Sequence, residues 1–184
     1  MLEPIKKVIQ LFFAGRQKIR SHRMRLINDL TDVSQLALFF CINTKEELKE
    51  IADFLVKIKT PGKQVTAYVF CPAYDTLDVV TDKSILFFNL TDFTIFAKMK
   101  EELKSNIQDL SFELMVSFVR TSNPFCHFLL AEINADFKVG PNNPDMTNVY
   151  DLCVKYDTDN LGFAHFHQQV MHYLSVLNIE AKHN

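Results

Sequence analysis

The chain has few glycines and no glycine-rich loop. Only four of its 184 residues are glycine, and they lie far apart, at Gly15, Gly62, Gly140 and Gly162. None of them begins a GxGxxG or a GxxxxGKS/T motif, the patterns whose backbone N–H groups hold phosphates at the start of a helix. The missing motifs exclude the usual diphosphate-binding loop of dinucleotide and nucleoside triphosphate sites.

Long apolar runs and paired cysteines are also missing. No apolar run in the sequence reaches the roughly 18 residues that a membrane-spanning helix needs, and the short run at 8–13 lacks the cleavage site of a signal peptide. The cysteines form no CxxC pair, and each lies in an apolar segment: Cys41, Cys71, Cys126 and Cys153. Reduced core thiols without an export signal predict a cytoplasmic protein.

Charge is present but unevenly distributed. The net charge is −2, with 20 basic and 22 acidic residues. Residues 1–28 carry seven Lys or Arg against Glu3 alone, a charge of +6, which leaves 13 basic and 21 acidic residues, a charge of −8, for the rest. A basic arm on an acidic body is expected to dock on its own domain, on a partner subunit or on an anionic surface.

Apolar periodicity predicts alternating strands and helices. An apolar stripe of Ile5, Val8, Ile9 and Phe12 predicts an amino-terminal helix. Further helices are expected at 45–58, which follows a capping box from Thr44 to Glu47, and at 97–107, 124–133 and 161–177. Strands are expected at 36–42, 65–71, 85–88, 112–119, 137–139 and 151–156.

This alternation predicts an α/β fold of the Rossmann-like type. We expect a mostly parallel sheet of five to six strands with helices on both faces, in the order 3-2-1-4-5. The basic arm at 1–30 precedes a single domain at 31–184. In such a sheet a ligand crevice lies beyond the carboxyl ends of strands one and four.

Several segments carry a family resemblance. They are the basic amino-terminal segment, the apolar run Leu36–Ile42 with its capped helix, Ile85–Asn89 leading into Asp92–Phe96, and Ala135–Pro141, the most specific of them. Through these, residues from about 35 to 177 resemble an uncharacterised family of small bacterial proteins with a domain of unknown function. The resemblance implies the fold and no activity.

The run Ala135–Pro141 has a second resemblance. After a strand and a helix, it is similar to a segment in the amino-terminal domain of heptosyltransferase-type glycosyltransferases. The second Rossmann domain of those enzymes, which holds the sugar nucleotide, has no counterpart in this chain. The similarity therefore implies a shared fold and not transferase activity.

Polar residues follow the strands whose ends meet at the expected crevice. Their hydroxyl, amide and guanidinium groups, together with two helix N-termini, suit a small anion. The same residues also suit helix capping and surface ion pairs, which need no ligand and which we favour. The candidate ligand-binding residues are Asn43, Thr44, Arg120, Thr121, Ser122 and Asn142.

Catalytic and metal sites are not indicated. The sequence has no GxSxG motif, and no catalytic residue is predicted. His165 and His172 share a helix face but lie two turns apart, a long spacing for two ligands of one zinc ion. We therefore expect no metal site and no cofactor.

The sequence leaves the function open between two classes. The first is a non-catalytic binding or interaction module whose amino-terminal helix docks on a protein partner or forms a homodimer. The alternative is an enzyme or ligand sensor that binds a nucleotide-sugar or another phosphate-bearing small molecule. The small net charge predicts no general attraction to nucleic acid, although an arm that contacts anionic lipid or nucleic acid is a third idea.

Overall fold

A single parallel sheet organises the domain. The computed structural model describes residues 33–72, 84–94, 99–120, 123–144, 149–156 and 162–182. Among these residues, six strands pair in the order β3-β2-β1-β4-β5-β6, and every pairing between them is parallel. The predicted α/β fold and its central order 3-2-1-4-5 are confirmed, with β6 added at the edge. The amino-terminal helix and the arm at 1–30 lie outside the described residues.

The elements alternate along the chain as expected. The strands are β1 (Gln35–Cys41), β2 (Gln64–Phe70), β3 (Ile85–Phe88), β4 (Ser111–Ser117), β5 (Asn134–Pro141) and β6 (Leu152–Val154). The helices are α2 (Lys45–Ile58), the short 3-10 helix η2 (Leu90–Asp92), α3 (Glu101–Gln108), α4 (Pro124–Glu132) and α5 (Phe163–Lys182).

The central strand β1 shows why the sheet is covered on both faces. Its residues from Leu36 to Phe40 are almost completely buried, as a continuous apolar run predicts. Alternate side chains enter two separate core clusters. Leu36, Leu38 and Phe40 join the first cluster, while Ala37 and Phe39 join the second.

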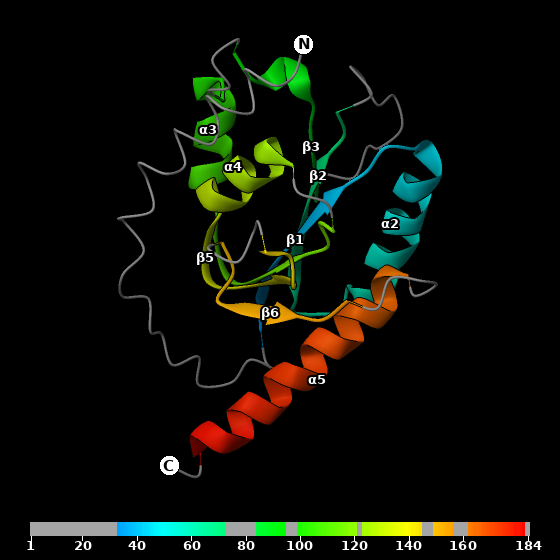
Figure 1. Cartoon of the computed structure of the whole chain (residues 1–184), viewed down its shortest axis with the longest axis vertical. Coiled ribbons are helices and arrows are strands. Elements are labelled where there is room, and N and C mark those ends of the chain that lie inside the picture. Colours follow the sequence, from blue (N-terminus) through cyan, green and yellow to red (C-terminus); the bar gives the residue numbers. More distant parts are fainter. Residues whose placement is uncertain are drawn as a thin grey trace.

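In the described part of the chain, α2 and α5 cover one face of the sheet, and α3 and α4 cover the other (Figure 1). The first cluster contains buried residues of α2 and α5, including Ile51 and Phe166. The second contains buried residues of α3 and α4, including Ile107 and Leu129. Among the described residues, no helix is both long and apolar enough to cross a membrane.

Several boundaries differ from the sequence prediction by a few residues, and two of them have a structural explanation. The helix expected from residue 97 begins at Glu101, because Met99 forms an isolated β-bridge with Phe93 just before it. The strand expected at 137–139 begins earlier, at Asn134, and extends to Pro141 instead of stopping at Gly140. The proline is tolerated because its pairing with β4 has ended by that point, and only β6 continues beside it.

Candidate functional site

The candidate site lies where the chain reverses direction across the sheet. From β1 the chain first builds β2 and β3 on one side, and then returns to build β4 on the other. In open parallel sheets ligands bind at such a switch point, beyond the carboxyl ends of the two strands. Here Ile42, Asn43 and Thr44 follow β1, and residues 118–120 follow β4. We call this region the switch-point edge.

The start of α2 uses its own side chains to satisfy its backbone. The carboxylate Oε2 of Glu47 accepts hydrogen bonds from the backbone N–H of Asn43 at 2.7 Å and of Thr44 at 3.0 Å. The backbone N–H of Glu47 donates in return to Thr44 Oγ1 at 3.2 Å. The predicted capping box is confirmed. Because Glu47 already supplies a negative charge here, the terminus is poorly suited to an anionic ligand.

At the start of α4, a side chain also accepts hydrogen bonds from the backbone N–H groups. Asn123 Oδ1 accepts hydrogen bonds from the backbone N–H of Phe125 at 2.9 Å and of Cys126 at 3.4 Å. Pro124, at the first helical position, has no N–H to offer. The two helix N-termini at the switch-point edge therefore have internal partners for the donors that a phosphate would use. Thr121 and Ser122 lie outside the described residues.

The remaining predicted residues lie on the β4–β5 side of this edge. The guanidinium carbon of Arg120 lies 5.0 Å from the centroid of the Tyr156 ring, a cation–π contact. The backbone carbonyl of Arg120 accepts a hydrogen bond from Asn143 Nδ2 at 3.2 Å. Asn142 is exposed, and its backbone N–H donates to Val154 O at 2.8 Å. Arg120 and the loop after β5 are thus brought together, whereas Asn43 and Thr44 bond within their own helix start.

A cluster of hydroxyl and thiol groups lies at the same edge, on the face of the sheet that α3 and α4 cover. The Tyr150 hydroxyl donates to Ser117 Oγ at 2.9 Å, and both residues are buried. Burial raises the pKa of Tyr150, so the phenol stays protonated and acts as a donor. The Cys126 thiol hydrogen-bonds the sulfur of Cys41. We call Cys41, Ser117, Cys126 and Tyr150 the switch-point cluster.

The sequence gives no signal for this cluster. Ser117 and Tyr150 are 33 positions apart, and Ser117 sits in a segment that is otherwise apolar. Only the placement of β1, β4, α4 and the segment before β6 around one point of the sheet brings the four side chains together. Cys71 is buried after β2, and its backbone N–H donates to Phe88 O at 2.8 Å.

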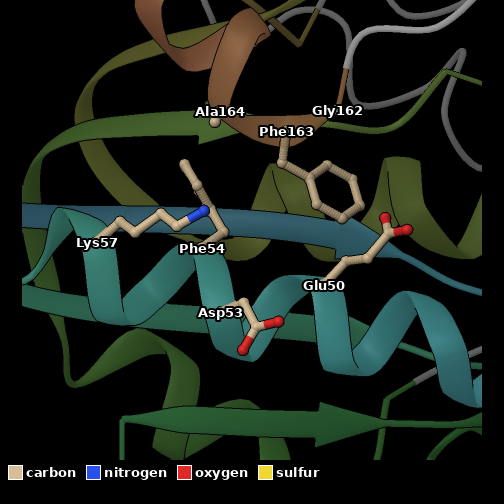
Figure 2. A pocket seen from close by; sticks show the side chains of 7 residues that line it. All are labelled: Glu50, Asp53, Phe54, Lys57, Gly162, Phe163 and Ala164. Carbon is tan, nitrogen blue, oxygen red and sulfur yellow. The ribbon is translucent and has the colours of Figure 1, made fainter.

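A shallow pocket of about 260 Å³ opens between α2 and the first turn of α5. Figure 2 shows Glu50 and Lys57 on either side of the aromatic rings of Phe54 and Phe163, while Asp53 points away from α5. Phe163 packs edge-on against Phe40 at 5.0 Å between centroids. The pocket is therefore the solvent-facing rim of the first core cluster, with charges of both signs at its mouth.

Metal ligands do not gather anywhere in the described part of the chain. There, no three side chains of His, Cys, Asp or Glu lie close enough together to hold an ion. All four cysteines are free thiols, with Cys71 and Cys126 buried and Cys41 and Cys153 partly exposed.

Comparison with known proteins places this domain in a family. Residues 6–177 match a family of unknown function. The chain belongs to the DUF6913 family. No curated protein and no solved structure matches it. The resemblance to heptosyltransferase-type glycosyltransferases is not supported by these comparisons.

The DUF6913 match takes in most of the basic arm together with the sheet. It therefore spans every residue of the switch-point edge, the pocket and the switch-point cluster. The family has no assigned function, so the roles of these residues have to be argued from their contacts.

The run Ala135–Pro141 has a structural explanation in this DUF6913 domain. Lys138 is only 2% exposed, and its Nζ donates to the carbonyl of Leu130, in the last turn of α4, at 2.6 Å. A cation at a helix C-terminus is favourable because the last carbonyls carry partial negative charge. Gly140 lies directly beneath the Tyr150 ring, where a side chain would collide. The run anchors α4 and leaves room for the switch-point cluster.

Proposed function

We propose that this DUF6913 domain is a non-catalytic interaction module that pairs with a second copy of itself. The observation that carries the proposal is an exposed apolar face on α5. Tyr173, Val176 and Leu177 are 48%, 40% and 40% exposed. Their spacing of three and four residues puts them on one side of the helix, beside the stripe that contains the buried Val170 and Leu174.

The place of the amino-terminal arm in the chain also supports pairing through the α5 face. The helix α5 follows β6 and runs back toward the amino ends of the strands, so its second half lies at the edge where β1 begins (Figure 1). Val33, where the described chain starts, shares the first core cluster with Leu174. The described chain therefore begins at the same end of the sheet as the second half of α5, and the arm at 1–30 precedes that point in the sequence. Its predicted apolar stripe is of the kind that such a face buries.

Charge also favours association between copies. The arm carries +6 over residues 1–28, and the remainder carries −8. Opposite charges on two surfaces speed their encounter and fix their orientation more than they raise affinity. In a symmetric pair the arm of each chain meets the acidic body of the other.

The mass in solution tests the proposal. Light scattering on the full chain is expected to give the mass of two chains. Deleting residues 1–28, or changing Val176 and Leu177 together to Glu, is expected to give one chain with an unchanged circular dichroism spectrum, because a buried charge disrupts an apolar interface. The matched control is Val56→Glu, since Val56 is an exposed apolar residue on α2, at 76%. It should remain paired. A full chain with the mass of one copy contradicts the proposal.

A second candidate function is the binding of a phosphate-bearing small molecule at the switch-point edge. It is favoured by the approach of Arg120 to the loop with Asn142 and Asn143. Asn43, Thr44, Thr121 and Ser122 complete the proposed set, and the first two would contribute their side chains, because Glu47 already accepts from their backbone N–H groups. A thermal-shift screen of nucleotides and sugar phosphates is expected to find a stabilising ligand whose effect Arg120→Ala abolishes. If no compound raises the unfolding temperature, the second candidate function is contradicted and the interaction module remains.

We propose that this domain functions in the cytoplasm. The support is the state of the four cysteines, which are free thiols in the structure. Such thiols persist where glutathione and thioredoxin keep the compartment reducing. Fractionation of cells that express a tagged chain tests this location.

A further inference from the structure

Two thiols from distant parts of the sequence meet in the switch-point cluster. Cys41 is the last residue of β1, and Cys126 lies in the first turn of α4. Cys126 belongs to the second core cluster and Cys41 packs against it, and the two side chains are hydrogen-bonded to each other. The proposed function uses neither of them.

The two thiols differ in access to solvent. Cys41 is partly exposed, so a reagent can reach it, whereas Cys126 is completely buried. The hydrogen bond from Cys126 lowers the pKa of Cys41, against the opposing effects of burial and of the Glu47 carboxylate. Burial raises the pKa of Cys126. Cys41 is therefore the more readily ionised thiol and the more accessible one, as expected for an attacking cysteine with a resolving partner.

We propose that Cys41 and Cys126 form a redox-active dithiol that reacts with disulfide compounds. The Cys41 thiolate attacks one sulfur of a disulfide R–S–S–R, which forms a mixed disulfide at Cys41 and releases R–S⁻. The leaving thiolate takes the proton of Cys126. The Cys126 sulfur then attacks the Cys41 sulfur, which closes the Cys41–Cys126 disulfide and expels the second R–S⁻. Two protein thiols are oxidised, and one disulfide is reduced to two thiols.

The product would link two elements across the switch-point edge. The end of β1 is held in the sheet by β2 and β4, and α4 is anchored at its other end by Lys138. The disulfide joins a central strand to the helix that covers it. A reversible bond at this position changes how tightly α4 is held against the sheet.

Oxidation of the full chain tests the dithiol. We would incubate it with oxidised glutathione, block free thiols, digest it without reduction and identify linked peptides by mass spectrometry. The expected product is a Cys41–Cys126 peptide pair that has lost two hydrogen atoms. Cys126→Ser is expected to stop at a glutathione adduct on Cys41. Cys41→Ser should carry no adduct on Cys126, because that thiol is buried.

The matched control is Cys153→Ser, which removes the other partly exposed thiol. It should form the Cys41–Cys126 pair as the unaltered chain does. Because serine in the core can impair folding, alkylation of the unaltered chain provides a second measurement. Before oxidation, iodoacetamide should label Cys41 faster than Cys153. After oxidation, it should no longer label Cys41, because that thiol is in the disulfide. A chain in which Cys153 takes up glutathione while Cys41 stays free, or in which no linked pair forms, overturns the proposal.

Discussion

His167 on α5 shows how its surroundings set the charge of a side chain in this domain. Its ring packs edge-on against Phe54 at 5.6 Å between centroids. Its Nε2 is buried without a hydrogen-bond partner among the described residues. Burial, and then the positive charge of Lys63, lowers the pKa of His167 to about 4. The folded domain therefore keeps this histidine neutral.

This histidine predicts that the domain loses stability in mild acid. In the unfolded chain its pKa is about 6.5, so between about pH 6.5 and 4 only the unfolded chain takes up the proton. The free energy of unfolding then falls as the pH falls through this window, by up to about 3 kcal/mol. Urea unfolding at pH 7.5 and pH 4.5 is expected to show the loss in the unaltered chain and less of it in His167→Leu. The exposed His172→Leu is the control, and equal losses in both variants would contradict the assignment.

At the residue scale, contacts within one helix start were predictable and contacts across the sheet were not. The capping box of Thr44 and Glu47 follows from a spacing of three residues, because the geometry of the first helical turn is local. The bond between Tyr150 and Ser117 depends on which strands become neighbours. So does the contact between Cys41 and Cys126. A local sequence pattern does not specify which strands become neighbours.

The strand β5 gives a prediction at the scale of one element. A Cβ atom at Gly140 would overlap the Tyr150 ring, which is buried and held by its hydrogen bond to Ser117. Gly140→Ala must therefore displace the ring or bend β5, and we expect it to cost roughly 1–3 kcal/mol of unfolding free energy. Gly162→Ala, with nothing within 4 Å of the new atom, is expected to change stability little. Denaturant unfolding of both variants measures the difference, and equal stabilities would show that the ring adapts.

Element boundaries were predictable where local chemistry decides them. The start of α4 at Pro124 follows from Asn123 and the proline, whose fixed backbone angle suits a first helical turn. The end of β5 was misjudged because Gly140 and Pro141 usually interrupt a strand. They remain in this one because β6 pairs alongside them, and that pairing is a tertiary contact.

At the scale of the whole molecule, the order of the strands was predictable. Alternating strands and helices with right-handed crossovers leave few arrangements for a parallel sheet. The pocket between α2 and α5 was not predictable in the same way. It exists because Phe163 meets Phe54 and Phe118 in the first core cluster, and the chain brings those residues together only after folding.

The pairing proposed for α5 has a thermodynamic readout at this scale as well. When association stabilises the folded chain, the midpoint of thermal unfolding rises with protein concentration. The variant with Glu at Val176 and Leu177 should lose this dependence, and Val56→Glu should retain it. A midpoint that is independent of concentration in the unaltered chain would contradict pairing.

The placement of Tyr150 has an optical consequence. The chain contains no tryptophan, so its near-ultraviolet absorption and emission come mainly from its five tyrosines. One of these rings is buried over Gly140, bonded to Ser117 and close to the sulfur of Cys126. Tyrosine spectroscopy can thus follow events at the switch-point edge without an added dye.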